Sequence, residues 1–145
     1  ITIGTTAITF ALAFRMGSSS TSTDAPTIQW LAFDLTGLNG VLTTATGLFE
    51  QVNPACTVLQ AAASCKTASA TGGLIFDIHG NGTTILGSKI TIDATEISSF
   101  DAAVQPTIAT TSFSSPWRMR IDCDDDGDGL ATGPVVVMLK VRWPT

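Results

Sequence analysis

The sequence predicts an all-β protein, an antiparallel β-sandwich of the jelly-roll kind with at most one short helix near residues 57–66. Two observations carry this prediction. Short segments rich in Val, Ile, Thr and Phe recur with turn signals about every 8–12 residues. The segment 117–123 alternates strictly, which is typical of a half-buried strand. One face would carry Trp117, Met119, Ile121 and Cys123, and the other Arg118, Arg120 and Asp122.

Apolar alternation and β-branched composition place the remaining strands. The sequence Gly80-Asn81-Gly82 predicts a tight hairpin turn, because Asn-Gly readily adopts positive φ. Residues 98–103 are expected to form a loop, and the Ala-rich segment 57–66 is expected to form the short helix. The expected strands are Ile1–Phe14, Ile28–Leu35, Gly73–His79, Thr83–Leu86, Lys89–Asp93, Thr107–Phe113 and Val135–Trp143.

Length and composition limit the functions that the chain can have. The 145 residues suffice for one domain, 1–145. Charged residues make up 13% of the chain, against about 25% in ordinary soluble domains. The net charge is −5 without a basic stripe, so we expect no nucleic-acid binding. The longest apolar runs, 8–14 and 135–139, are too short to span a membrane. A first residue Ile1 instead of Met indicates a processed chain or an excerpt.

Three cysteines leave two interpretations open. Cys56 and Cys65 lie nine residues apart, and a disulfide between them would close a small loop. Cys123 would then be left over, and an odd count argues against a disulfide framework. The alternative is three buried thiols that pack as small hydrophobic side chains.

An acidic cluster supplies the only candidate metal ligands. Asp122, Asp124 and Asp126 occupy positions 1, 3 and 5 of the calcium-loop pattern, and Gly127 occupies position 6. Position 12 is Gly133, so the bidentate glutamate is missing. We therefore expect either a calcium site in a β-hairpin loop, with Asp128 as a further ligand, or a solvated acidic turn. No cofactor is expected to be required.

Candidate catalytic residues are few. His79 is the only histidine and adjoins the predicted hairpin, where a structural or exposed role is expected. Asp77, Asp93 and Glu96 are candidates for a carboxylate pair by residue type alone. Asp77 is expected on the face of Ile75, as a solvent-facing or turn-bonding carboxylate. The sequence contains no nucleophile elbow, phosphate loop or zinc motif, so we predict that the chain is not an enzyme.

Two motifs bear on binding. Asn81-Gly82-Thr83 matches a glycosylation sequon, although hairpin chemistry explains Asn-Gly without it. Trp30, Trp117 and Trp143 are candidates for a sugar-stacking platform. The alternative is that Trp117 and Trp143 lie on paired strands and fill the core or an interface.

The segment 71–141 resembles a β-rich module of tailed-phage structural proteins. The similarity rests on the order and spacing of ordinary strand and turn phrases. The Cys-containing segment 43–70 is longer than in such modules, and 124–128 is more acidic. The phrases are Thr71-Gly72-Gly73, Ile75-Phe76-Asp77-Ile78, Asn81-Gly82-Thr83-Thr84-Ile85-Leu86, Lys89-Ile90-Thr91-Ile92-Asp93, Glu96, Ser98-Ser99, Ala102-Ala103, Ile121-Asp122-Cys123-Asp124, Gly127 and Gly133 to Val141.

The resemblance implies a structural protein on the virion surface, which decorates or cements the capsid or forms part of a neck or tail fibre. It also implies a homo-oligomer, commonly a trimer, with the major capsid or tail proteins as further partners. Ile1–Phe14 and Val135–Trp143 are the expected edge strands for contacts between subunits. The alternatives are a carbohydrate-binding or adhesin-like module that binds a host-surface glycan, and a subunit of an extracellular filament.

Overall fold

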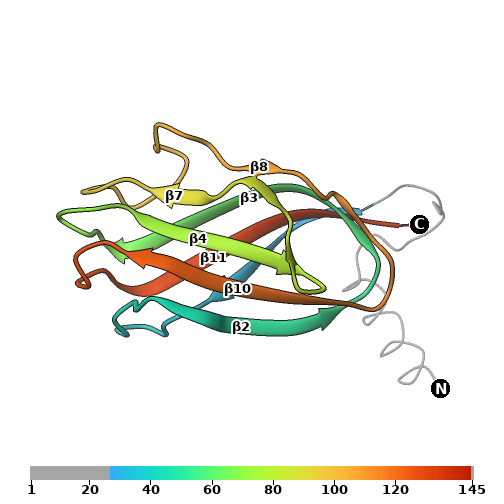
Figure 1. Ribbon diagram of the computed structural model, residues 1–145, viewed down its shortest axis with the longest axis horizontal. Helices are drawn as coiled ribbons and strands as arrows, with labels where there is room; N and C mark the ends of the chain where they lie inside the picture. Colours follow the sequence, from blue (N-terminus) through green and yellow to red (C-terminus); the bar gives the residue numbers. More distant parts are fainter. Residues whose placement is uncertain (1–26, 145) are drawn as a thin grey trace, which may run out of the picture.

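The computed structural model of the chain describes residues 27–144, and these residues form an antiparallel β-sandwich (Figure 1). One sheet has the order β1-β11-β3-β9, and the other has the order β2-β10-β4-β5, with β7 also paired to β4. A short third sheet joins β6 to β8. The bounds are β1 Thr27–Asp34, β2 Ala45–Asn53, β3 Cys56–Thr67, β4 Leu74–Gly80, β5 Thr83–Thr84, β6 Leu86–Ser88, β7 Ile90–Ile92, β8 Thr107–Ile108, β9 Ser112–Phe113, β10 Trp117–Asp126 and β11 Thr132–Trp143.

The predicted all-β sandwich is confirmed. Strands distant in the sequence are neighbours, since β11 pairs with both β1 and β3, and β10 pairs with both β2 and β4. This interleaved strand order is compatible with a jelly roll, but the jelly-roll form stays a prediction. So does the assignment of all of 1–145 to one domain, and the predicted strand Ile1–Phe14 lies outside the described residues. Within residues 27–144, no helix is long and apolar enough to cross a membrane.

Alternating apolar side chains from both sheets form the core. On β10, Trp117, Met119, Ile121 and Cys123 are all buried, which confirms the predicted facing of this strand. They meet buried side chains on the other sheet, among them Val137 and Leu139 of β11. Such burial of apolar surface is the main stabilising contribution to a sandwich of this kind.

The predicted helix near 57–66 is wrong, because these residues belong to β3. Ala61 and Ala63 pack in the core, and Ala63 exchanges hydrogen bonds with Ser99 of a neighbouring loop. The pairing register with β11 shifts between Gln60 and Val58, so one extra residue bulges there. Strand pairing on both sides therefore overrides the helical preference of alanine.

The same strand decides between the two interpretations of the cysteines and excludes a Cys56–Cys65 disulfide. The two cysteines lie at opposite ends of β3, roughly 30 Å apart at about 3.3 Å per residue. A disulfide requires Cα atoms within about 7 Å. Both thiols and that of Cys123 are free and buried, in agreement with the alternative interpretation.

The prediction that Val135–Trp143 is an edge strand is wrong. It forms most of β11, which lies between β1 and β3. The open edge of this sheet is β1, and the corresponding edge of the other sheet is β2 (Figure 1). The rings of Phe33 on β1 and Phe49 on β2 are 4.9 Å apart, so the two open edges lie along the same side of the sandwich.

Candidate functional site

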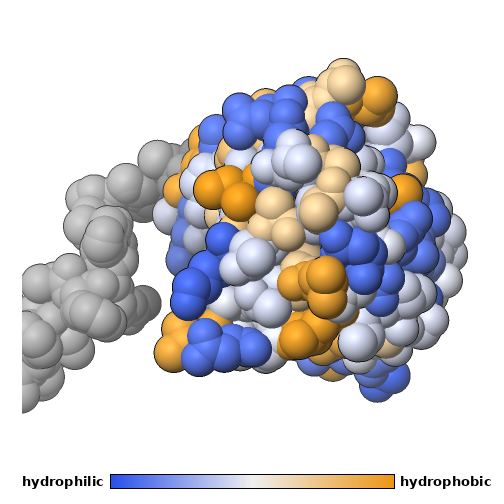
Figure 2. All heavy atoms as spheres, turned by 90° about the vertical axis from the view of Figure 1, so that its left-hand side faces the viewer, coloured by the Kyte–Doolittle hydropathy of each residue, from blue (hydrophilic) through white to orange (hydrophobic). Residues whose placement is uncertain are grey.

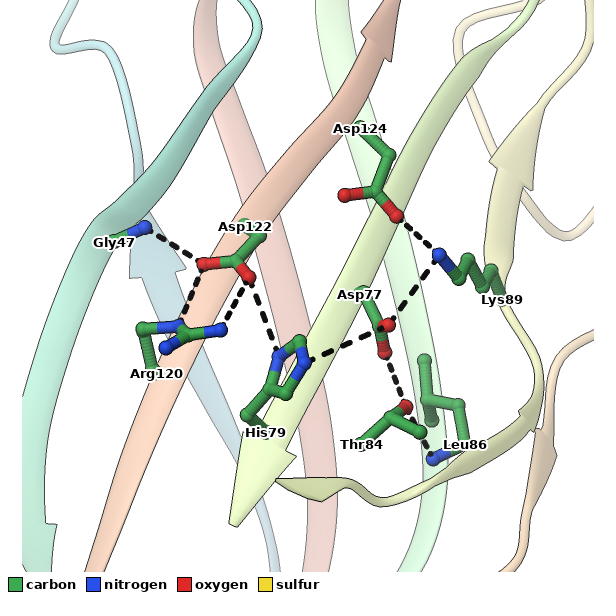
Figure 3. Close-up of polar contacts among 9 residues, drawn as sticks. All are labelled: Gly47, Asp77, His79, Thr84, Leu86, Lys89, Arg120, Asp122 and Asp124. Carbon is green, nitrogen blue, oxygen red and sulfur yellow. Dashed lines mark hydrogen bonds and ion pairs between the residues drawn. The ribbon is translucent and has the colours of Figure 1, made fainter. Parts of the chain in front are cut away.

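The outer face of the sheet β2-β10-β4 carries a cluster of charged side chains (Figure 3). Register explains the cluster, because Asp122 lies directly opposite Asp77, and Arg120 directly opposite His79. Residues paired across antiparallel strands point to the same face. We call this set the polar cluster, and its members are Asp77, His79, Thr84, Lys89, Arg120, Asp122 and Asp124.

Asp122 is held most firmly in the polar cluster. Arg120 donates two hydrogen bonds to it, from Nε to Oδ1 at 2.9 Å and from Nη2 to Oδ2 at 2.8 Å. The backbone N–H of Gly47 donates a third, at 2.7 Å. Burial raises the pKa of Asp122, but the hydrogen bonds from Arg120 and Gly47 outweigh burial and hold this pKa below its usual range.

His79 lies between the two opposed carboxylates. Its Nδ1 is 3.3 Å from Oδ2 of Asp122, and its Nε2 is 3.9 Å from Oδ2 of Asp77. The imidazole side chain is only 17% exposed. The position beside the hairpin agrees with the sequence prediction for this residue.

Asp77 is buried, at 4% exposure, so of its two predicted roles the solvent-facing one is wrong. It does share the outer face with Ile75, as predicted, but neighbours cover it. The Thr84 hydroxyl donates to Oδ1 at 2.5 Å, and Nζ of Lys89 lies 3.5 Å from Oδ2. Lys89 also reaches Asp124 at 2.5 Å; this hydrogen bond is the main reason that the pKa of Lys89 is raised.

The polar cluster thus contains three carboxylates, two permanent cations and one imidazole. Each of the three carboxylates accepts a hydrogen bond from a cation or a hydroxyl group within the polar cluster. A satisfied network of this kind stiffens the face of a sheet. The arrangement can fix the registers of β10 and β4 and hold the Gly47 backbone of β2 against them.

The four predicted calcium ligands have separate partners. Asp122 and Asp124 lie on β10 within the polar cluster. Asp126 accepts from the backbone N–H of Thr44 at 3.0 Å, and Asp128 from that of Ala70 at 2.7 Å. Within residues 27–144, no group of three or more His, Cys, Asp or Glu is arranged to hold a metal ion. Calcium binding stays a prediction, and the described geometry does not bring its four carboxylates together.

The remaining carboxylate candidates lie elsewhere. Asp93 follows β7 and accepts from the backbone N–H of Ala103 at 2.8 Å. Glu96 lies in the same connection, and its Oε2 is buried without a hydrogen-bond partner among the described residues. The Asn81-Gly82 turn is confirmed, with φ of 53° and 90°, and Asn81 Oδ1 accepts from the backbone N–H of Arg118.

The three tryptophans do not form one platform. Trp117 is buried and stacked on Phe113 with ring centroids 4.2 Å apart, and Trp143 donates to Gln29. These two tryptophans lie in different sheets, so the expectation that their strands pair is wrong. Trp30 on β1 remains 41% exposed.

Trp30 belongs to a second feature that sequence reasoning missed, the open edge of β1. Its ring lies edge-on to Phe100 at 6.4 Å, and Nζ of Lys140 lies 5.8 Å from its centroid. Ile28, on the same strand, is 50% exposed. Figure 2 shows the end of the sandwich that lies on the left in Figure 1, where hydrophobic residues form separate patches among hydrophilic ones.

No family model, no curated protein and no solved structure matches this chain in comparisons with known proteins.

Proposed function

We propose that this chain is a non-enzymatic structural module that assembles with copies of itself on the surface of a tailed-phage virion. The observation that carries the assembly is the open edge of β1. This strand ends its sheet and pairs on one side only within residues 27–144. It exposes Ile28 and Trp30 beside that edge. Exposed apolar residues along an unpaired strand are typical of a protein interaction site.

The virion location rests on the resemblance described above. The longer phrases fall on the successive strands β4, β5, β6, β7, β10 and β11, whereas Glu96, Ser98-Ser99 and Ala102-Ala103 lie in the connection between β7 and β8. The proposed roles are decoration or cementing of the capsid, or part of a neck or tail fibre. A trimer is the assembly that the resemblance implies, with major capsid or tail proteins as neighbours.

Gold-labelled antibody against the chain, applied to intact phage particles, tests this location. Label over the head supports a decoration or cement role, and label on the neck or tail supports a fibre role. Particles that carry no label, in a lysate where the chain is detected only as free protein, contradict the proposal.

The exposed Trp30 favours one alternative, a carbohydrate-binding module. An exposed indole beside Phe100 and Lys140 is a stacking surface for a sugar ring. A glycan array probed with the intact chain and with Trp30→Ala distinguishes the two proposals. Glycan binding that Trp30→Ala abolishes supports the alternative, and an array without signal removes it.

A further inference from the structure

The edge of β1 lacks the features that normally prevent strands from pairing between molecules. Sheet edges are usually protected by charged residues, proline, bulges or shortness. β1 is eight residues long and pairs with β11 in one uninterrupted register. It contains no proline and no charged residue before Asp34, its last. The neighbouring edge β2 differs, because it contains the charged Glu50 and its register with β10 is interrupted.

The backbone groups that point out of this edge can be assigned. Leu35 donates its N–H to the carbonyl of Val135 at 2.8 Å, so its backbone is directed toward β11. Successive residues of an antiparallel strand direct these groups to alternate sides. The N–H and C=O groups of Ile28, Trp30 and Ala32 therefore point away from β11, toward the open edge.

The same three residues place their side chains on the outer face of the sheet. All three are exposed, whereas Leu31 and Phe33 pack on the core side. A strand added at this edge would therefore form backbone hydrogen bonds with β1 and would also contact the apolar side chains of Ile28, Trp30 and Ala32. This combination defines β-strand addition as a mode of recognition.

We propose that β1 pairs antiparallel with β1 of a second copy, with Trp30 opposite Trp30 at a two-fold axis. This inference rests on the proposed self-assembly, but it assigns a two-fold dimer in place of the trimer that the resemblance implies. Ile28 would lie opposite Ala32 of the other copy, and the two four-stranded sheets would join into one of eight strands. Directly opposed residues then share a face, as antiparallel pairing requires.

A second copy fits this edge because the strand is complementary to itself. When two β1 strands pair with Trp30 at the two-fold axis, no two charged residues lie opposite each other. Asp34, the only charged residue of β1, lies beyond the three positions that form hydrogen bonds between the copies, 28, 30 and 32. Asp34 is also already occupied, because it accepts from the backbone N–H groups of Thr36 and Gly37. A contact of this kind is isologous and closes as a dimer.

The first test is the mass of the full chain in solution by light scattering. We expect twice the 15.0 kDa chain mass. Ala32→Lys places a charge on the edge, and Ala32→Pro removes an N–H that has no partner within the described fold, so both should yield monomers. Val52→Lys on β2, at an equally open edge, is the matched control and should leave the dimer intact.

The second test does not depend on those variants. In the proposed dimer, the two Cα atoms at position 30 lie about 5.5 Å apart, so Trp30→Cys brings two thiols close together. The two Cα atoms at position 28 lie about 13 Å apart along the strands, so Ile28→Cys does not. Dibromobimane, which joins thiols in near contact, should link Trp30→Cys copies and not Ile28→Cys copies. Circular dichroism of each variant confirms that it is folded.

The outcomes separate this contact from self-assembly in general. A monomeric parent chain overturns both proposals. A trimer, or a dimer that Ala32→Lys leaves intact, overturns the β1 contact and retains self-assembly. Loss of the dimer when residues 1–24 are deleted would identify the N-terminal segment as the partner strand and would also overturn it. Dimers that Ala32→Lys dissociates and that Trp30→Cys cross-links support it.

Discussion

Asp77 and Asp122 lie directly opposite each other across the antiparallel pair β4 and β10, and their side chains are only 6% and 7% exposed. Two opposed carboxylates repel each other unless cations lie between them. Arg120, Lys89 and His79 all contact one or the other, so the sheet face depends on this balance.

The two aspartates are therefore expected to differ when neutralised. Asp122→Asn should lower the free energy of unfolding by about 1–3 kcal/mol, because three charge-assisted or backbone hydrogen bonds are weakened. Either variant removes the repulsion, but Asp77→Asn should cost less, because Asp77 accepts one hydrogen bond, from Thr84, where Asp122 accepts three. Urea unfolding of both variants measures the difference, with the more exposed Asp124→Asn as the control. Equal losses for Asp77→Asn and Asp122→Asn would contradict this account.

The lowered pKa of Asp122 predicts a loss of stability in acid. The unfolded chain binds a proton at this residue near pH 4, about the ordinary value, while the folded chain resists protonation to lower pH. The stabilisation is therefore complete above about pH 4 and is lost as the pH falls through the folded value. Urea unfolding at pH 7, 5, 4 and 3 should show this decline, and Asp122→Asn should show a smaller one. An identical pH dependence in both proteins would argue against it.

The three thiols should be inert in the folded protein. Burial is the main cause that raises the pKa of Cys123 to about 12, and burial also raises the pKa of Cys56 and Cys65. Only thiolates react readily, so Ellman's reagent at pH 8 should label none of them in the native state. In denaturant it should label all three. Fewer than three equivalents under denaturing, non-reducing conditions would indicate a disulfide.

Gly80 at the end of β4 should not tolerate a side chain. A Cβ there would lie 2.6 Å from Cε1 of Phe113 and 3.0 Å from Cγ2 of Ile85. Gly80→Ala should therefore displace Phe113 from its stack on Trp117 and cost about 1–3 kcal/mol of stability. Thermal unfolding and the near-ultraviolet signal of Trp117 measure both effects. Thr83→Ala, at the exposed position paired with Gly80, should change stability by less than about 0.5 kcal/mol and serves as the control.

Local patterns in the sequence predicted much of the fold. The alternation from Trp117 to Cys123 and the Asn81-Gly82 turn are properties of neighbouring residues, so they could be read directly. The Ala-rich β3 was missed because its strand state depends on pairing with β11 and on contacts with the loop at Ser99. Pairing partners far apart in the chain leave no local signal.

The candidate site was predictable only in part. Asp122 and Asp124 were singled out as members of an acidic turn, and Asp77 and His79 as separate candidates. The register that sets Asp122 against Asp77, and Arg120 against His79, unites residues more than forty positions apart. The alternation of Arg118, Arg120 and Asp122 did place their side chains on the outer face. The open edge of β1 could not be predicted, because edge position depends on the order of all the strands.

The strand order has a consequence for biosynthesis. β10 and β11 are successive in the chain, yet each is the central partner of its sheet, between β2 and β4 and between β1 and β3. A ribosome-bound chain that has emerged only as far as β9 holds the strands on either side of β10 and β11, which are β2 and β4 and β1 and β3, but neither of the strands that join them. The sandwich can therefore close only after the final hairpin leaves the ribosome, so folding is delayed until synthesis of residues 27–144 is nearly complete.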